Sequence, residues 1–320
     1  MPHPTPVGKW QSRYVQKAPK LCIQLVAAFA LILSGVTIFL GEEIVDFHAE
    51  GKGGQRRISY HIKWWQSVQI FHEGVSELDY RFQTSHVTVL RRNRSRGFPV
   101  KDHCALVGNG GVLLGSGCGA TIDSYDCVIR VNLAPYGGEF SSDVGSSVDL
   151  ITANYEQFNA LVSCTSHPLG GETPADREDC ASLIHRLKGA NGKILWFFKT
   201  PKNFRTMRRM LRVLRTEHKL NMSFAYSPAF PMTAAMMAWR FRFPSSGLAT
   251  YTAATQFCRH VHLFGFYPFA TDSRNQPLRH HYYENTTMNY SKNAHKMPEE
   301  YRLFLELNST GAIRLVNDCR

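Results

Sequence analysis

The stretch from Cys104 to Pro135 reads CALVGNGGVLLGSGCGATIDSYDCVIRVNLAP and decides how the chain is expected to fold. An apolar strand at 105–107 enters a glycine-rich turn, and a second apolar strand at 128–131 ends at Asn132. Glycine-rich turns that follow strands let backbone N–H groups come close to a phosphate. The stretch therefore indicates a nucleotide-type ligand held over the ends of strands.

Two standard nucleotide-binding fingerprints fail in this turn. The dinucleotide fingerprint G-x-G-x-x-G, started at Gly108, needs a glycine where Leu113 stands, and Asn132 replaces the acidic residue expected after the second strand. Ser116 stands where the P-loop has its lysine. We expect this turn to meet a nucleotide through backbone N–H groups and amide side chains, while a plain tight turn between strand and helix stays open.

Strand-like and helix-like segments alternate from about residue 97 onward. Strands are expected at 104–108, 127–131, 148–152, 193–198, 261–265 and 312–316, and helices at 118–124, 180–188, 204–218, 246–260 and 298–308. Short apolar runs separated by helical patterns favour an α/β fold with a mainly parallel sheet covered by helices. Such sheets bind ligands at the carboxyl ends of their strands, where the glycine-rich turn and Asn132 both fall.

One long apolar run, 21–40, predicts a membrane anchor. Twenty residues at about 1.5 Å each span roughly 30 Å, the thickness of a bilayer core. Basic residues precede the run and acidic residues follow it, so the positive-inside rule places residues 1–20 in the cytosol and the rest in a lumen or outside. A cleaved signal peptide is the competing interpretation, but its apolar region is usually about 7–15 residues long.

The residues beyond this run carry signs of an oxidising, glycosylating compartment. Seven of the eight cysteines lie there, as do five N-x-S/T sequons, at Asn93, Asn221, Asn285, Asn289 and Asn308. We interpret 41–97 as a stem with one helix near 60–80, and 98–320 as a catalytic-type domain. The net charge of +12 favours acidic partners such as anionic lipid, acidic sugars or nucleotides.

Four segments in order resemble the motifs of the animal sialyltransferases, glycosyltransferase family 29. The large motif resembles CALVGNGG with SGCG, IDSYD, RVNLAP and DVGS; the small motif resembles Pro244–Pro268; the third resembles HYYE at 281–284; and the very small motif resembles HKMPEE at 295–300. The SGCG cysteine and the H-x-M-P-x-E form are most similar to the α-2,8 branch. Glu284 also resembles the branch that makes α-2,6 linkages to N-acetylgalactosamine.

This resemblance implies a type II Golgi membrane enzyme with its catalytic domain in the lumen. The implied fold is a Rossmann-like, mainly parallel sheet, a variant of the GT-A type. The implied reaction moves sialic acid from CMP-sialic acid to a glycan hydroxyl with inversion. An α-2,8 linkage to a terminal sialic acid is expected, and the acceptor is left open between glycolipid and glycoprotein.

The resemblance also assigns roles to single residues. His295 would be the general base, since imidazole titrates near neutral pH, and His281 would contact the leaving phosphate. Glu300 would either orient His295 or help to cap the helix that Pro298 can start. Further residues expected to bind the donor are Asn109, Asn132, Asn154, Ser245, Ser246, Gly247, Tyr267 and Tyr282. Tyr283 is expected to pack.

The sequence predicts catalysis without a metal or another cofactor. No D-x-D occurs, nor a C-x-x-C or an H-E-x-x-H, so the motifs that usually hold a catalytic divalent ion or zinc are missing. The expected partners are CMP-sialic acid, a sialylated glycan acceptor and the membrane. A nucleic-acid partner is not expected, and a homodimer is left open.

The family pattern implies two disulfides, Cys104–Cys258 and Cys118–Cys319. A third pair, Cys164–Cys180, is left open, and Cys127 is expected to be a buried free thiol.

Five arginines between 205 and 215 recur at helical spacing opposite an apolar stripe. This cationic face is either simply solvated or attracts acidic glycans. The segment 221–237 lacks lysine and arginine, so mono- or oligosialylation is favoured over long polymers. There are two rival functions. One is an inactive homologue that only binds sialylated ligands or a CMP-sugar, and the presence of His281, His295 and Asn109 disfavours it. The other is a nicotinamide enzyme, which Leu113 and Asn132 disfavour.

Overall fold

The computed structural model describes residues 100–166, 174–197, 204–226, 230–255, 257–287 and 295–320, and three short strands before them. The expected membrane anchor at 21–40 and the sequons at Asn93 and Asn289 lie outside the described residues. Among the residues that are described, no helix combines the length and the apolar character needed to cross a bilayer.

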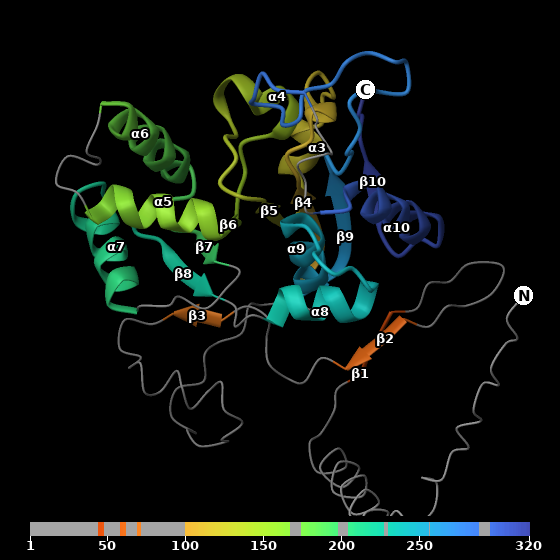
Figure 1. Ribbon diagram of the computed structural model, residues 1–320, viewed down its shortest axis with the longest axis horizontal. Coiled ribbons are helices and arrows are strands. Elements are labelled where there is room, and N and C mark those ends of the chain that lie inside the picture. Colours follow the sequence, from red (N-terminus) through yellow and green to blue (C-terminus); the bar gives the residue numbers. More distant parts are fainter. Residues whose placement is uncertain are drawn as a thin grey trace, which may run out of the picture. The chain divides into compact units, whose positions relative to one another are not determined.

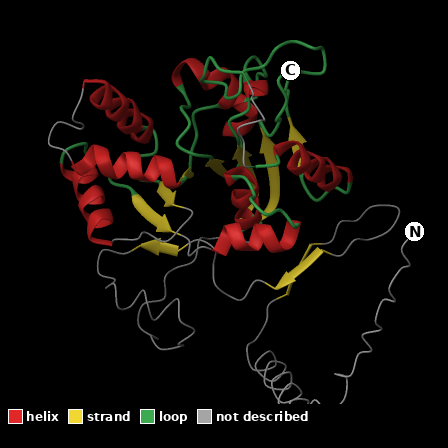
Figure 2. Cartoon of the chain, viewed as in Figure 1, coloured by secondary structure: helices red, strands yellow, loops and turns green. Residues whose placement is uncertain are grey.

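An eight-stranded sheet forms the centre of the described fold (Figures 1 and 2). Its spatial order is β10-β9-β4-β5-β6-β7-β8-β3, and every neighbouring pair is parallel except β3 with β8. The strands are β3 (Gln69–Phe71), β4 (Lys101–Val107), β5 (Cys127–Arg130), β6 (Leu150–Ala153), β7 (Ile194–Phe197), β8 (Ser223–Tyr226), β9 (Cys258–Phe264) and β10 (Arg314–Val316). Two further strands, β1 (Ile44–Phe47) and β2 (Ile58–His61), are not part of this sheet. The predicted mainly parallel sheet is confirmed.

The strand order reverses direction at β4. From β4 the chain runs outward through β5, β6, β7 and β8, and then returns to place β9 and β10 on the other side of β4. Neighbouring connections that leave in opposite directions open a crevice at the carboxyl ends of the two strands. The switch point between β4 and β9 is therefore where a ligand cavity is expected.

Helices cover both faces of the sheet, as Figure 1 shows. They are α3 (Gly119–Asp123), α4 (Ser141–Val144), α5 (Tyr155–Ser166), α6 (Pro174–Lys188), α7 (Phe204–Thr216), α8 (Phe230–Trp239), α9 (Ser246–Ala254) and α10 (Met297–Ser309), with short 3-10 turns η1 (Gly111–Leu113) and η2 (Gly138–Phe140). On β7, Leu195 and Phe197 pack into the cluster that contains α5, α6 and α7, whereas Trp196 packs into the cluster that contains α9 and α10. Successive side chains on a strand point to opposite faces, which explains why these parallel strands are apolar throughout.

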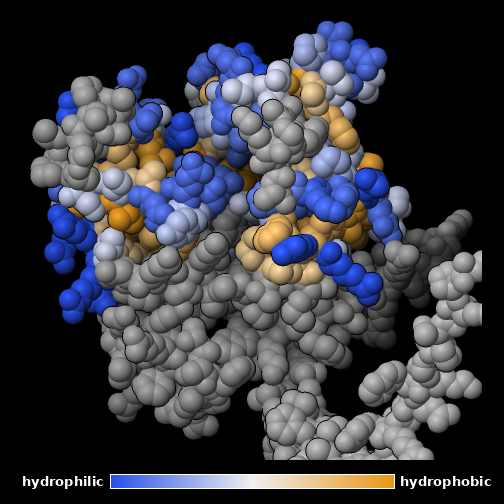
Figure 3. Space-filling view, in the orientation of Figure 1, coloured by the Kyte–Doolittle hydropathy of each residue, from blue (hydrophilic) through white to orange (hydrophobic). Residues whose placement is uncertain are grey.

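Helix α7 has the amphipathic character that its arginine spacing predicts. Met207, Met210 and Leu214 are buried, while Arg205 and Arg212 are exposed. Figure 3 shows a strongly hydrophilic outer surface over α7, and a more apolar surface over α8.

Several sequence predictions of single elements were wrong. The helix expected over 246–260 ends at Ala254, because β9 begins at Cys258. The helix expected near 60–80 is not found in the described part of that range, where Ile58–His61 and Gln69–Phe71 are strands. Elements α5, β8 and α8 were missed: β8 has only four residues, and α8 is apolar on all sides and so carries no clear period. β3 comes from the expected stem and forms the edge of the sheet.

Three disulfides are present among the described residues, and two of them join parts of the chain that are distant in sequence. Cys104–Cys258 and Cys118–Cys319 match the family pattern, and Cys164–Cys180, which the sequence left open, links α5 to α6. Cys127 is a buried free thiol, as expected, and its burial, helped by Asp149, raises its pKa to about 12.

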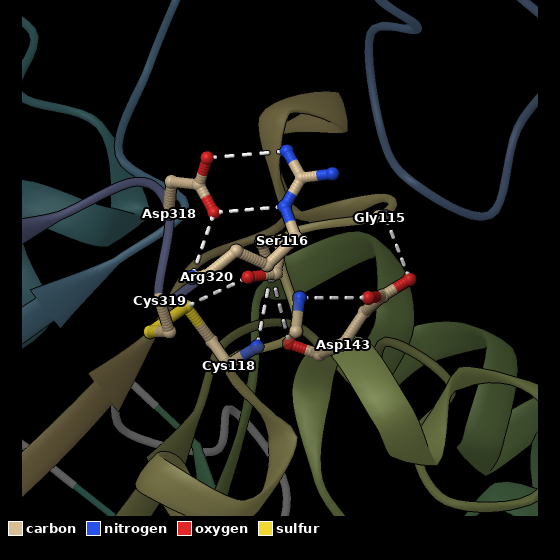
Figure 4. Close-up of polar contacts among 8 residues, drawn as sticks. Gly115, Ser116, Cys118, Asp143, Asp318, Cys319 and Arg320 are labelled. Carbon is tan, nitrogen blue, oxygen red and sulfur yellow. Dashed lines mark hydrogen bonds and ion pairs between the residues drawn. A yellow bond between two sulfur atoms is a disulfide. The ribbon is translucent and has the colours of Figure 1, made fainter.

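The C-terminus is fastened to the glycine-rich turn, as Figure 4 shows. Cys319 is disulfide-bonded to Cys118, and its backbone N–H donates to the carbonyl oxygen of Ser116 over 3.0 Å. The Asp143 carboxylate accepts from the N–H groups of Gly115 (2.8 Å) and Gly117 (3.0 Å). Both glycines have φ near +70°, which disfavours other residues. The turn is thus closed around the Asp143 carboxylate.

Candidate active site

A cavity of about 380 Å³ lies over the carboxyl ends of β4, β5, β6 and β9. It occupies the switch point at which the strand order predicts a ligand site. The predicted site residues that line it are Asn109, Asn132, Asn154, Ser245, Ser246, Gly247, Tyr267, His281, His295 and Glu300. The tertiary structure thus brings together motifs that span almost 200 residues of sequence.

Close backbone packing between the loops after β4 and β9 forms one wall of the cavity. Gly110 donates its N–H to the carbonyl oxygen of Gly265 over 3.1 Å, and a Cβ added at Gly110 would lie 2.5 Å from that oxygen. Gly265 has φ +72°, and a Cβ there would lie 2.5 Å from Leu113 Cδ1. Only glycine lets the two loops approach this closely.

Two asparagines present unpaired polar atoms beside the cavity. The side-chain oxygens of Asn109 and Asn132 are buried and have no hydrogen-bond partner among the described residues. Asn132 adopts φ +58°, a conformation that asparagine tolerates better than most residues, and its N–H donates to Thr152 Oγ1 over 2.9 Å. A buried amide oxygen without a partner is unfavourable by about 1–3 kcal/mol, so a ligand donor is the natural partner for each.

The third asparagine has a structural task as well. Asn154 Oδ1 accepts from the N–H of Gln157 over 2.8 Å and so caps the first turn of α5. Asn154 also lines the cavity.

Glu300 fastens the start of α10 to the start of α9. Its carboxylate accepts from the backbone N–H of Ser245 (2.7 Å) and from Ser245 Oγ (2.5 Å), and its residue is only 3% exposed. Ser245 is the N-cap of α9, and its Oγ also accepts from the N–H of Leu248 over 3.1 Å. Burial outweighs the hydrogen bonds from Ser245 and raises the pKa of Glu300.

This contact bears on a question that the sequence left open. The Glu300 carboxylate accepts its hydrogen bonds from Ser245 and so supports the N-terminus of α9, while His295 has a smaller electrostatic effect on the Glu300 pKa. The Ser245 hydroxyl is consequently occupied, so the N–H groups of the first turn, at Ser246 and Gly247, are the ones free of partners within the helix.

His295 is held by one ring nitrogen. Its Nδ1 lies 3.0 Å from the carbonyl oxygen of Phe243. A carbonyl only accepts, so Nδ1 carries the proton of the neutral ring, and Nε2 carries the basic lone pair. The cavity wall therefore includes an imidazole in the tautomer that a general base needs.

His281 lies against the glycine-rich turn. A β-bridge joins it to Gly110, and the next N–H, of Tyr282, donates to the carbonyl oxygen of Asn109 over 3.0 Å. His281 Nδ1 lies 2.9 Å from Glu284 Oε1, a distance typical of an ion pair although the pair is not aligned as a hydrogen bond. Glu284 thus lies directly beside the ring that the sequence assigned to the leaving phosphate.

Tyr282 does not line the cavity. It is 1% exposed, its hydroxyl donates to the carbonyl oxygen of Pro135, and its ring packs edge-on against Phe140. Burial raises its pKa far above the ordinary value. Tyr282 is a core residue that attaches the third motif to the large motif. Tyr283 stacks on His281 with ring centroids 5.3 Å apart, in keeping with the expected packing role.

Several lining residues were not predicted from the sequence. His280 and Tyr301 contribute to the wall, as does Glu156 at the start of α5. Burial, and then His281, lowers the pKa of His280. The adjacent position of His280 and His281 was the one local signal, whereas Glu156 precedes no recognisable pattern.

Comparisons with known proteins agree with this geometry. The sequence model of glycosyltransferase family 29 (sialyltransferase) matches residues 52–312. Alpha-2,8-sialyltransferase 8F of Mus musculus is 30% identical over 254 residues, which cover 75% of this chain and 61% of that protein. Alpha-2,8-sialyltransferase 8E of Rattus norvegicus is 32% identical over 217 residues, covering 66% of this chain and 54% of that protein. The chain thus spans about three fifths or less of the length of these relatives.

Solved structures give a weaker likeness. The crystal structure of a mammalian sialyltransferase in complex with Gal-beta-1-3GalNAc-ortho-nitrophenol is 22% identical, with a TM-score of 0.42, and the match covers 68% of this chain and 70% of that one. The family assignment depends instead on the sequence match, which includes every motif described above. The chain belongs to glycosyltransferase family 29, the sialyltransferases.

Proposed function

We propose that this chain transfers sialic acid from CMP-sialic acid to a hydroxyl group of a glycan, with inversion at the anomeric carbon. The observation that carries the proposal is the set of polar groups that converge on one cavity. These are the unpaired amide oxygens of Asn109 and Asn132, the first turn of α9, and the imidazoles of His281 and His295. Each can meet a different part of a sugar nucleotide and its acceptor.

The donor would lie along the carboxyl ends of β4 and β5. Asn109 and Asn132 would accept from the hydroxyl or amino groups of the nucleotide. The N–H groups of Ser246 and Gly247 at the start of α9 favour the phosphate, since a helix N-terminus attracts an anion. His281, whose Nδ1 lies 2.9 Å from Glu284 Oε1, would donate to the phosphate oxygen on which charge develops.

The reaction would proceed by a single displacement. The acceptor oxygen attacks the anomeric carbon of sialic acid on the face opposite to CMP, and its proton passes to His295 Nε2. The bond between the anomeric carbon and the phosphate oxygen breaks, and its electron pair leaves with CMP. Phe243, by accepting from Nδ1, holds the ring in the tautomer that receives the proton. No step requires a metal ion, so we expect activity to persist in EDTA.

For the linkage we propose α-2,8 transfer onto a terminal sialic acid. Both relatives named above are α-2,8-sialyltransferases, and the SGCG and H-x-M-P-x-E segments resemble that branch. We propose a lumenal catalytic domain in the Golgi, in agreement with the three disulfides of the described residues. The acceptor would be a sialylated glycolipid or glycoprotein.

The direct test compares His295→Ala with His218→Ala. His218 is exposed and lies in the turn after α7, away from the cavity lining. Since a general base contributes about 10²–10⁴-fold, His295→Ala should lose at least 10²-fold in kcat while still binding CMP, and His218→Ala should keep wild-type turnover. Near-normal turnover of His295→Ala would refute the assignment.

An acceptor panel tests the linkage in the same assay. Transfer to sialylated acceptors, with α-2,8 product identified by NMR, supports the proposal. Transfer only to N-acetylgalactosamine would replace it by the α-2,6 alternative. CMP-sialic acid binding without transfer to any acceptor would point to an inactive homologue.

A further inference from the structure

A group of histidines lies at the amino ends of β4 and β9, the end of these strands remote from the cavity. His103 on β4 is the register partner of His260 on β9, and their rings stack with centroids 4.8 Å apart and an interplanar angle of 19°. The ring of His262, two residues further along β9, lies edge-on to that of His103, with ring centroids 6.0 Å apart. Alternate residues of a strand share a face, so the three imidazoles lie on one side of the sheet.

A carboxylate completes the group. Asp102 Oδ2 lies 3.9 Å from His103 Nε2, and its other oxygen, Oδ1, lies 3.5 Å from the guanidinium of Arg259. Arg259 thereby holds one oxygen and leaves the second directed at the histidines. The metal-ligating atoms of Asp102, His103 and His260 all lie within 4.8 Å of one another, and all three residues are exposed.

We propose that Asp102, His103 and His260 form a binding site for one divalent transition-metal ion, with Zn²⁺ as the best fit. Imidazole nitrogen and carboxylate oxygen are common zinc ligands, at about 2.0–2.2 Å from the ion. Two nitrogens on a tetrahedral zinc are then roughly 3.3 Å apart. Exposed side chains can close the remaining gap of about 1.5 Å by rotation, and water would fill the open coordination position.

The same chemistry argues against other ions and other ligands. Magnesium and calcium prefer oxygen, whereas imidazole suits zinc, copper and nickel. His262 is left out of the ligand set, because the ligand atoms that lie within 4.8 Å of one another belong to Asp102, His103 and His260. His103 and His260 thus supply both nitrogen ligands.

The site would not take part in sialic acid transfer. His103 and Gly108 are five residues apart on β4 and the turn that follows it, which corresponds to about 16 Å along a strand. The ion would instead link β4 to β9 at the ends that lie far from the cavity. The Cys104–Cys258 disulfide already joins these two strands next to the proposed ligands. A bound ion would therefore add a second, reversible link across the switch point of the sheet.

The test uses the full purified chain, stripped of metal with a chelator and titrated with Zn²⁺ in competition with a chromophoric zinc indicator. Wild type should bind one Zn²⁺ ion per chain with higher affinity than any further Zn²⁺ ion that it binds. His103→Ala and His260→Ala should each weaken that equivalent at least tenfold, and Asp102→Asn should weaken it by less. His262→Ala is the matched control and should keep the wild-type affinity. Cobalt(II) added to wild type should give a visible d–d spectrum that the double variant of His103 and His260 does not give.

Two results would overturn the proposal. One is wild-type zinc affinity in the double variant His103→Ala/His260→Ala. The other is an equal loss in His262→Ala and His103→Ala, which would indicate a diffuse histidine-rich surface without a defined ligand set. All substituted residues are exposed or partly exposed. The melting temperature of each variant without metal, compared with that of wild type, reports whether the variant is folded.

Discussion

The contact between Glu300 and Ser245 gives the most specific prediction for this protein. Glu300→Ala removes two hydrogen bonds that join the first turns of α10 and α9. A hydrogen bond to a charged group contributes about 1.5–3 kcal/mol. Glu300 is almost completely buried, so solvent does not screen these bonds. With the lower value for each of the two bonds, Glu300→Ala should lower the free energy of unfolding by about 3 kcal/mol.

The assay is thermal unfolding, supported by kinetics. For a domain of this size 1 kcal/mol corresponds to about 2–4 °C, so Glu300→Ala should lower Tm by about 6–12 °C. Glu300→Gln keeps the shape and one acceptor oxygen, so its loss should be smaller. The KM for CMP-sialic acid should rise in both variants, because the first turn of α9 lines the cavity and loses its support.

Glu299→Gln is the matched control. Glu299 is the neighbouring residue, and its exposed pair with Lys296, at 3.3 Å, is expected to contribute about 0–1 kcal/mol. A Tm of Glu300→Ala within about 1 °C of wild type, or a drop of equal size in Glu299→Gln, would refute the reasoning.

Three further predictions follow from the same structure. Burial raises the pKa of Glu300, so the folded state holds this proton more tightly than the unfolded state, and the stability that the group contributes falls as pH rises through its folded pKa. In urea unfolding, the free energy of unfolding of wild type should therefore increase relative to that of Glu300→Gln as the pH is lowered from neutral. The same pH dependence of the unfolding free energy in both proteins would contradict this. Replacing both Cys118 and Cys319 by serine opens a loop of 201 residues and should lower the free energy of unfolding by about 5 kcal/mol in non-reducing denaturant titrations; a change below about 1 kcal/mol would be inconsistent with this. Gly110→Ala should raise the KM for CMP-sialic acid, because the added Cβ pushes the loops after β4 and β9 apart. Gly115 has φ +70° and no atom within 4 Å of an added Cβ, so Gly115→Ala should lower the free energy of unfolding by about 1–2 kcal/mol and leave KM unchanged. Equal effects of the two substitutions on KM would argue against the clash at Gly110.

Local patterns were sufficient for much of the fold. The apolar runs that form β4, β5 and β7 are short and bounded by turn residues, and arginines at helical spacing indicate α7. Such patterns reflect burial on one or both faces, which each element expresses in its own residues. Elements without a local period were missed, since α8 is apolar on all sides and β8 is recognisable only by its pairing with β7.

The sequence by itself thus determined the class of sheet, the family and ten residues of the cavity wall, because each motif is a local string whose order along the chain can be read directly. Only the tertiary structure decided what those residues do to one another. The hydrogen bonds from Ser245 to Glu300 cross 55 positions, the Tyr282 side chain turns into the core, and His103 meets His260 because β9 returns to lie beside β4. These outcomes depend on strand order and on competition for buried space, neither of which is written in any single segment.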